Sequence, residues 1–400
     1  MRFGMITTFY PPFSYGGDAT YVRNLARSLV ALGHEVELIA STDAYFVRSK
    51  EVADVDTTNE DGIKVHRLNH PAGLLAALVS HQTGQPGLYA AALKSFFASP
   101  FDVLHFHNIS LMGAPGVLGM GEARARLLSL HDHWLVCPTH VFWKNGSRAC
   151  DRRTCFSCSV RSGLPPQLWR YTSLRERHLA KLDRIFAPSR YTADKHREDG
   201  VEASIDVLPL FSSIDGRSDA GPAVHNRLIY AGRVTALKGI GNLVRVVAGM
   251  PDIELVVVGD GDMKARLVAD YGDRPNIRFI GKVDQPALAR HYAEAAAVVV
   301  PSIVPETFGL SLVEASACGT PGIVASGAGG APEIAKRTGG GLIYEGDAEL
   351  MDAIRSIARD QQLRSRLGAL ARAGYESHYT REKHLAAYLR HVAEIVHNRA

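Results

Sequence analysis

The sequence predicts an α/β protein with two domains, each built on a doubly wound parallel sheet. Its 400 residues exceed what one ordinary core supports and suggest two domains of about 200 residues each. Short uncharged apolar runs alternate with segments of helical periodicity, the pattern of parallel strands joined by helices. This pattern restarts at Leu228, after the segment 211–225, where Ser, Asp, Gly and Pro accumulate. We therefore predict a first domain over 1–210, a second over 211–380 and a final helical segment over 381–400.

The first domain opens with a predicted βαβ unit. The apolar run 3–9 reads as a buried strand, 35–41 as the next strand, and the residues between them as a helix that Gly33 ends. Gly16 and Gly17 precede this helix at the carboxyl end of the first strand. The glycine loop is similar to a phosphate-binding turn but lacks the full dinucleotide fingerprint, so its spacing alone is a weak signal.

The remaining elements follow the same alternation. Further strands are predicted at 63–68, 103–108, 126–132 and 184–189, and two short helices within 70–100, interrupted near 84–87. From Leu228 onward the strands of a second parallel sheet alternate with helices. The segment 382–398 has apolar residues on one helical face and no strand after it.

Composition and charge exclude several classes of protein. The chain is 46% hydrophobic and 22% charged, as expected of a soluble globular protein. The first residues lack the features of a signal peptide, and no apolar run approaches the roughly 20 residues of a membrane helix. The prediction is a cytoplasmic protein, with attachment to the cytoplasmic face of a membrane left open.

The positive charge is concentrated in the first half. The net charge is +4 overall, and residues 144–197 alone hold 13 Lys or Arg against 4 Asp or Glu. Such a positive electrostatic field favours an anionic partner. The alternative interpretation is a charged helical face that is exposed to solvent and binds no partner.

Two glutamates with seven residues between them form the most informative pattern. Glu306 falls in the loop after the apolar run 297–301, and Glu314 within the helix that Phe308, Gly309 and Leu310 open. A helix start has unpaired N–H groups and a partial positive charge, which suit a phosphate. The two carboxylates are placed to accept hydrogen bonds from sugar hydroxyls.

Other candidate residues follow strands of the second sheet. Arg233 and Lys238 come after its first strand, where ligands bind in open α/β sheets, and two cations there suit a diphosphate. Gly259 ends the next strand and allows a close backbone approach, although a plain turn explains it equally well. Val283 follows the third strand, where backbone groups could meet a base.

Four cysteines cluster in the sequence of the first domain, within a Cys-rich insertion at 137–160. Cys150, Cys155 and Cys158 have C-x4-C-x2-C spacing, and Cys137 precedes them. In a cytoplasmic chain this pattern favours a structural zinc site over disulfides. Free thiols, a redox-labile pair and an iron–sulfur cluster remain the alternatives. Cys318 is predicted to be a buried small residue.

A histidine and an aspartate end a strand of the first domain. His131 and Asp132 would lie at the carboxyl edge of the sheet, where a histidine can hydrogen-bond a sugar hydroxyl or shuttle a proton. His107 competes for the same role.

Taken together, these residues resemble the retaining glycosyltransferases of family 4. The similarity runs through YPPFSYGG and LARSLVALGHEV, LHDHW, YAGRVTALKG and VPSIVPETFGLSLVEASACGTPGIVAS. It implies the GT-B fold, in which two Rossmann-like domains face a central cleft and the last helix crosses back to the first domain.

The resemblance also implies roles for single residues. Glu306 would contact the transferred sugar, Glu314 the ribose, and Arg233 with Lys238 the departing diphosphate, so that catalysis needs no metal. His131 would touch the transferred sugar. The catalytic candidates are thus His131, Glu306, Arg233 and Lys238. The donor-binding candidates are Gly17, Arg233, Lys238, Gly259, Val283, Glu306, Phe308, Gly309, Leu310 and Glu314.

The predicted function is retaining transfer of a hexose-type sugar from a nucleotide-diphosphate sugar. Its acceptor is left open: an anionic or lipid-linked molecule of envelope polysaccharide or glycolipid assembly, or a small molecule of antibiotic or thiol biosynthesis. Among enzymes that share the fold, sugar phosphorylases need a pyridoxal lysine or a phosphate site that the sequence does not show, and the paired glutamates argue against epimerases. A nucleic-acid-binding module is rejected because it leaves two α/β domains unexplained.

Overall fold

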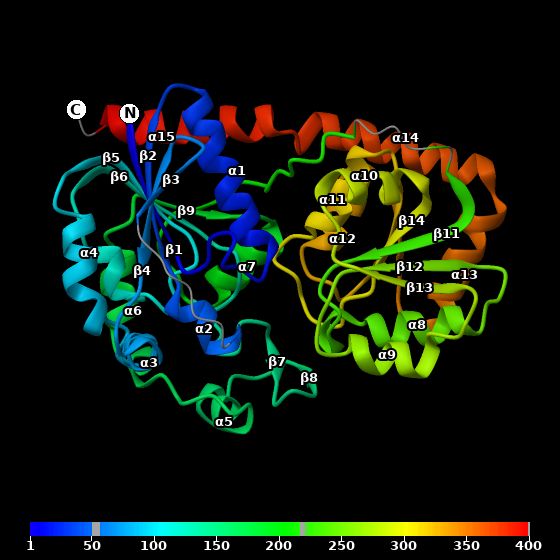
Figure 1. Cartoon of the computed structure of the whole chain (residues 1–400), viewed down its shortest axis with the longest axis horizontal. Helices are drawn as coiled ribbons and strands as arrows, with labels where there is room; N and C mark the ends of the chain where they lie inside the picture. The colour runs from blue at the N-terminus through cyan, green and yellow to red at the C-terminus, as the bar shows by residue number, and fades with distance from the viewer. Residues whose placement is uncertain (50–56, 217–220, 222, 399–400) are drawn as a thin grey trace. The chain divides into compact units, whose positions relative to one another are not determined.

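The computed structural model describes residues 1–49, 57–216, 221 and 223–398, and it divides the chain into two compact units (Figure 1). The first unit comprises residues 1–188, 192–208 and 385–400, and the second comprises 189–191 and 209–384. Part of the predicted linker 211–225, namely residues 217–220 and 222, lies outside the described residues. Each unit is an α/β body with one principal sheet, so the predicted fold class is confirmed.

The first unit is built on a sheet with the order β10-β9-β6-β5-β1-β2-β4-β3. All its neighbours run parallel except β3 and β4. The short edge strands β3 and β10 were not predicted, since three residues carry little periodicity. The strands are β1 (Arg2–Thr7), β2 (Glu35–Ser41), β3 (Thr58–Glu60), β4 (Ile63–Leu68), β5 (Phe101–Phe106), β6 (Ala123–Ser129), β9 (Arg184–Ala187) and β10 (Ile205–Val207).

Helices connect these strands, and a small hairpin interrupts the pattern after β6. The α-helices are α1 (Gly17–Ala31), α2 (Asp43–Ser49), α3 (Gly73–Thr83), α4 (Ala90–Phe96), α5 (Cys155–Arg161), α6 (Leu174–Leu179) and α7 (Arg190–Glu198). Short 3-10 turns are η1 (Gly87–Tyr89), η2 (Gly116–Gly119) and η3 (Leu168–Tyr171). The hairpin consists of β7 (Trp143–Lys144) and β8 (Arg148–Ala149).

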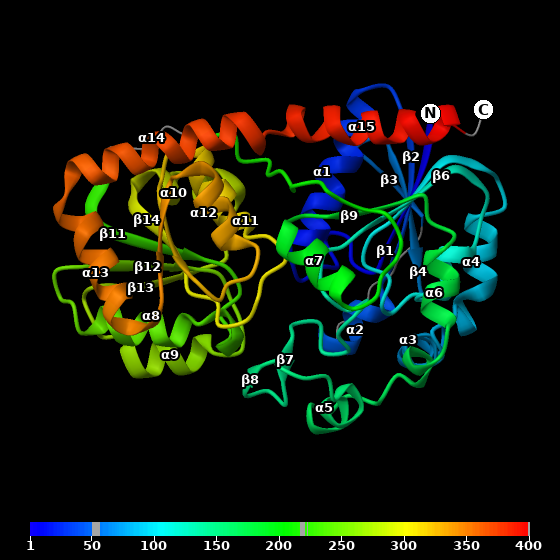
Figure 2. The ribbon, with the colours of Figure 1, turned by 180° about the vertical axis from the view of Figure 1, so that it is seen from behind.

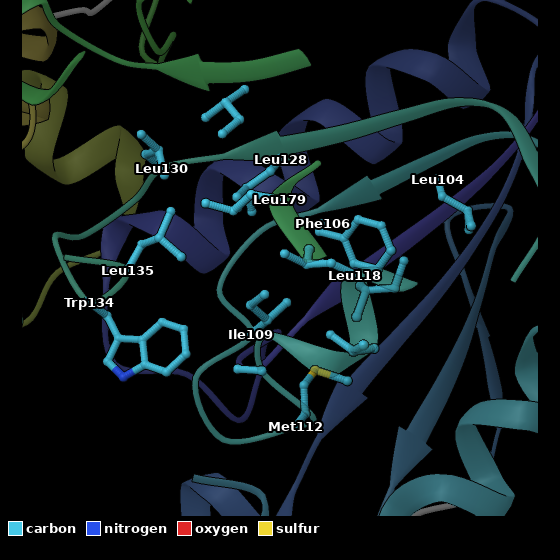
Figure 3. Packing of buried hydrophobic residues seen from close by; sticks show 14 of the residues in the cluster. Leu104, Phe106, Ile109, Met112, Leu118, Leu128, Leu130, Trp134, Leu135 and Leu179 are labelled. Atoms are coloured by element: carbon cyan, nitrogen blue, oxygen red, sulfur yellow. The ribbon is translucent and has the colours of Figure 1, made fainter. Parts of the chain in front are cut away.

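The core of the first unit lies between its sheet and helices, as Figure 3 shows for Leu104, Phe106 and Leu128. The final helix, α15 (Arg381–Asn398), also reaches this unit. Its Tyr388 is fully buried, and its hydroxyl lies 3.0 Å from Nδ1 of His105. The last helix is therefore a structural part of the first sheet's core.

The second unit carries a six-stranded sheet whose neighbours are all parallel, in the order β13-β12-β11-β14-β15-β16. Its strands are β11 (Val224–Ala231), β12 (Glu254–Val258), β13 (Ile277–Gly281), β14 (Ala295–Val300), β15 (Gly322–Ala325) and β16 (Gly341–Tyr344). The α-helices of this unit are labelled in Figure 2. They are α8 (Ile240–Ala248), α9 (Lys264–Tyr271), α10 (Gln285–Glu294), α11 (Leu310–Ala317), α12 (Ala331–Thr338), α13 (Gly346–Arg359) and α14 (Gln361–His378). A short 3-10 turn, η4 (Ala236–Lys238), precedes α8.

Strand order predicts where each sheet binds ligands. Numbered along the chain, the second sheet reads 3-2-1-4-5-6, and the central strands of the first sheet follow the same scheme. The order reverses between β11 and β14 in one sheet and between β1 and β5 in the other. Ligands of such sheets bind at the carboxyl ends of the strands beside this reversal. Among the described residues, no helix is long and apolar enough to span a membrane.

Candidate active site

The carboxyl edge of the second sheet gathers most of the residues that the sequence singled out. Arg233 follows β11, Lys238 ends η4, and Glu306 follows β14. Because β11 and β14 are adjacent and parallel, the two loops emerge side by side. The three side chains thus belong to the switch point of this sheet.

Glu306 is held by a cation and a hydroxyl. Lys238 Nζ lies 3.0 Å from Glu306 Oε1, and the Ser302 hydroxyl donates to the same oxygen. Burial acts to raise the pKa of Glu306, but Lys238, Ser302 and Arg233 outweigh it and hold the pKa below its ordinary value. Glu306 is therefore a carboxylate at neutral pH.

Glu314 has the opposite electrostatic environment. It lies within α11, where Tyr292 donates to Oε2 at 3.0 Å and Ser212 to Oε1 at 3.2 Å. Burial raises its pKa to about 7, because these two neutral hydroxyls only partly offset the loss of water. The two glutamates thus differ in charge at mildly acidic pH.

The backbone at the start of α11 packs closely against α12 and leaves several N–H groups without a backbone partner in the part of the chain that the structure describes. Gly309 has φ 122°, and a Cβ there would lie 2.8 Å from the Cβ of Ala331. The N–H groups of Phe308, Gly309 and Leu310 donate no backbone hydrogen bond within the described residues. These donors follow Glu306 closely in the chain, and N–H groups left unpaired at a helix start are suited to binding an anion.

Two further candidates lie at the ends of neighbouring strands. Gly259 follows β12 with φ 131°, and a Cβ there would approach Gly232 O to 1.9 Å. The close packing of two strand-end loops requires this glycine. Val283 follows β13 and is half-buried. Both residues therefore lie on the same edge of the sheet as Arg233.

The first unit brings two histidines together at its own carboxyl edge. His107 follows β5 and His131 follows β6, and His107 Nδ1 lies 3.0 Å from His131 Nε2. Burial lowers the pKa of both imidazoles, although Asp18 and Asp132 act to raise that of His131. Two neutral rings in this contact share one hydrogen bond, so the tautomer of one constrains the tautomer of the other.

The glycine loop lies near this histidine pair. Gly17 is the first residue of α1, and Tyr21 on the same helix packs against His131 with ring centroids 5.3 Å apart. Asp132, next to His131, accepts from Trp134 N–H and from His140 Nδ1, each at 2.8 Å. A cavity of about 20 Å³ lies beside the pair, lined by His107, Asn108, Ile109, Leu128, Ser129, Leu130, His131, Asp132, Trp134 and Leu135.

The four clustered cysteines also lie together. All four are unpaired thiols, and they line one cavity of about 20 Å³. Within the part of the chain that the structure describes, no group of three or more His, Cys, Asp or Glu side chains is arranged to hold a metal ion. Cys318 lies at the end of α11, half-buried rather than buried as predicted.

Several contact residues were missed by sequence reasoning. Ser302, Tyr292 and Ser212 hold the two glutamates, and Tyr21 packs on His131. Serines and tyrosines at such positions carry no spacing signal, and Ser212 lies 102 residues from Glu314. Only the position of Ser302, shortly after a buried strand, could have identified it.

Two family models match the chain. The model described as "Glycosyl transferase 4-like domain" matches residues 16–210. The model described as "Glycosyl transferases group 1" matches residues 221–374. The matched residues contain His131 in the first case and the Lys238–Glu306 pair in the second.

Comparisons with individual proteins agree with these matches. A D-inositol 3-phosphate glycosyltransferase of Catenulispora acidiphila is 36% identical over 404 residues, covering 91% of this chain and 87% of that protein. The sucrose-phosphate synthase structure from Thermosynechococcus elongatus has a TM-score of 0.76 at 20% identity, with 100% of both chains covered. The structure of Anabaena HepE with UDP-glucose has a TM-score of 0.66 at 17% identity, again over 100% of both chains.

Proposed function

Because the chain belongs to the group 1 glycosyltransferases of family 4, a retaining family, we propose that it transfers a hexose from a UDP-sugar to a phosphate-bearing acceptor. The observation that carries the proposal is the Lys238–Glu306 pair beside Arg233 at the switch point of the second sheet. The UDP-glucose complex of HepE, which shares the fold, supports UDP as the nucleotide.

The second unit supplies the donor chemistry in this proposal. The N–H groups at the start of α11, together with Arg233 and Lys238, face the diphosphate. They stabilise the negative charge that grows on it as the glycosidic bond breaks. Two fixed cations and a helix start thereby do the electrostatic work that a divalent metal does elsewhere. Glu306 accepts a hydrogen bond from a sugar hydroxyl, and Glu314 accepts hydrogen bonds from the ribose.

In this proposal the first unit contributes further contacts to the donor and binds the acceptor. His131, whose tautomer is coupled to that of its neighbour His107, hydrogen-bonds the transferred sugar. The Gly17 loop contributes backbone donors for the phosphates. The acceptor hydroxyl attacks the face from which the diphosphate departs, and the departing phosphate takes its proton. The configuration at the anomeric carbon is thereby retained.

A direct assay tests the reaction. Purified protein is incubated with a panel of UDP-sugars and D-inositol 3-phosphate, without added Mg²⁺. UDP release is measured, and the product linkage is read by NMR. We expect an α-linked product from an α-linked donor. A β-linked product would overturn the mechanism, and a sugar epimerised in the absence of acceptor would favour the epimerase alternative.

The acceptor class rests on the surface of the first unit. Eight large apolar side chains are at least 40% exposed on or beside α3, α5 and η3: Leu74, Leu75, Leu78, Leu88, Phe156, Val160, Leu168 and Tyr171. Trp169 Nε1 donates to His81 O at 3.0 Å and so joins η3 to α3. Arg161 at the end of α5 is exposed, and Arg148 and Arg153 on the same segment are exposed but pair with Asp151 and Asp199. Apolar and basic groups together suit an anionic membrane surface, where a lipid-linked phosphate acceptor would reside.

Liposome flotation tests this membrane contact. We expect the protein to float with anionic vesicles at low salt, to detach at high salt because screening weakens the arginine contacts, and to ignore zwitterionic vesicles. A Leu74→Ser/Leu75→Ser variant should bind at least about tenfold more weakly, because two exposed side chains no longer enter the lipid interface.

The matched control is Leu370→Ser, which alters a leucine that is 41% exposed on α14 of the second unit and should bind like the unaltered protein. Absence of binding at low salt would remove the membrane acceptor and leave a small phosphate-bearing molecule as the acceptor.

A further inference from the structure

The Cys-rich insertion has too little regular structure to hold itself together. It consists of the two-residue strands β7 and β8 and the seven-residue helix α5. An isolated hairpin and a helix this short are unstable in water. Both ribbon views place these elements together at one edge of the first unit (Figures 1 and 2). Something other than secondary structure must therefore stabilise them.

Backbone hydrogen bonds join the cysteines to the loop that follows β6. Cys137 N–H donates to His133 O at 2.7 Å, and His140 N–H donates to Cys137 O at 2.9 Å. Cys150 N–H donates to Phe142 O at 2.8 Å. These backbone hydrogen bonds therefore tie Cys137 and Cys150 to the loop that carries the hydrogen-bonded side chains of Asp132 and His140.

The four thiols surround a single cavity. It measures about 20 Å³, close to the volume of one water-sized sphere. Two cations, Lys144 and Arg152, line it as well, and no carboxylate is among its described lining residues. Apolar and hydroxyl-bearing side chains complete the lining, namely Pro138, Thr139, Phe142, Trp143 and Thr154. Within this wall the two cations could balance a centre that gains negative charge from the thiols.

Further contacts fit thiolate ligands. Asn145 N–H donates to Cys158 Sγ at 3.4 Å, the hydrogen bond that a metal-bound thiolate accepts. Lys144 is itself buried, with Nζ 2.9 Å from Arg152 O and 3.1 Å from Asp151 Oδ1. The cation is thus fixed beside the cavity rather than free in solvent.

We propose that Cys137, Cys150, Cys155 and Cys158 bind one structural zinc ion. The sulfur atoms do not yet converge on one point in this structure, so binding turns the side chains into the cavity they share. Cys155 and Cys158 are three residues apart on α5 and so lie on one face of it. Each thiol releases its proton to solvent on binding, and Lys144 and Arg152 offset the charge of the resulting tetrathiolate.

Zinc content and thiol protection test this proposal without an activity assay. Elemental analysis of the purified chain should find one zinc ion per chain. Alkylation followed by mass spectrometry should show the four thiols protected until a strong zinc chelator is added. Because this measurement uses the unaltered protein, a variant that fails to fold does not decide the result.

Two substitutions give a matched comparison. Cys155→Ser should lose most of the zinc and become sensitive to proteolysis within the insertion. Cys318→Ser removes the cysteine at the end of α11 in the second unit and should keep both zinc and protease resistance. Iron with a visible chromophore, a disulfide among the four, or chelator-independent alkylation would each overturn the proposal. The transferase proposal does not depend on this site, so its assay stands or fails separately.

Discussion

Replacing Lys238 by methionine is expected to lower kcat for UDP release by about 10²- to 10³-fold. The substitution keeps the length of the side chain and removes its charge. Lys238 lies 3.0 Å from Glu306 at the switch point, where the proposed mechanism places the departing diphosphate. The loss of one preorganised charge at a developing anion has effects of about this size. The donor KM should change far less, because the charge on the diphosphate grows in the transition state.

The control for this experiment is Arg245→Met. Arg245 pairs with Asp347 on an exposed face of the same unit, so this variant loses a cation without touching the candidate site. Its kcat should match that of the unaltered protein. The Lys238 variant must also keep its melting temperature within a few degrees, since removing the cation leaves Glu306 less well compensated. A Lys238→Met variant that is folded and as active as the control would contradict the assigned role.

The affinity for UDP is expected to rise as the pH increases through about 7, and Glu314→Gln should abolish this gain. Burial raises the pKa of Glu314 to about 7, so the carboxyl is protonated at pH 6 and ionised at pH 8. A carboxylate accepts hydrogen bonds from both ribose hydroxyls, whereas a protonated carboxyl or an amide does so less well. At pH 8 the variant should bind UDP about tenfold more weakly.

Protein stability should change in the opposite direction as the pH rises, over a window that begins at lower pH. The native pKa of Glu314 lies above the ordinary value of 4.5, so the native state binds more protons than the unfolded state between about pH 4.5 and 7. This group therefore makes the protein less stable as the pH rises across that window, by about 3 kcal/mol in total. The Glu314→Gln variant lacks this ionisable group. The melting temperature of the variant minus that of the unaltered protein should therefore increase as the pH rises.

Titration calorimetry with UDP at pH 6, 7 and 8 measures the affinity, and thermal melts from about pH 4.5 to 8 measure the stability. The phosphate of UDP also titrates, but it does so for both proteins, and the comparison between them removes its contribution. Parallel pH profiles for the two proteins would show that Glu314 neither titrates in this range nor meets the ribose.

The sequence predicted the fold, and it singled out residues that the structure brings to one edge of the second sheet, because both depend on local patterns. The Lys238–Glu306 pair could be anticipated, since each residue follows a strand and parallel strands end on one edge. The sequence could not show which strands, and hence which loops, become neighbours. Strands β11 and β14 are paired in the sheet although β12 and β13 lie between them in the chain. The residues that tune the glutamates, such as Tyr292 and Ser212, depend on that pairing and have no sequence signature.

The histidines of the first unit illustrate the same limit. His107 and His131 looked like rivals for one role, because each ends a strand. Their 3.0 Å contact follows from the pairing of β5 with β6 and makes them partners. Strand pairing thus changed the interpretation of two residues that the sequence had offered as alternatives.

The burial of Tyr388 has a consequence for how the chain folds during synthesis. The segment around Tyr388 belongs to the unit that begins at residue 1, and Tyr388 meets His105 across 283 residues. The amino-terminal unit therefore cannot complete its packing until Tyr388 has been synthesised and has left the ribosome. By then residues 209–384 of the second unit have been translated, so the unit whose synthesis starts first is completed only after the other has been made.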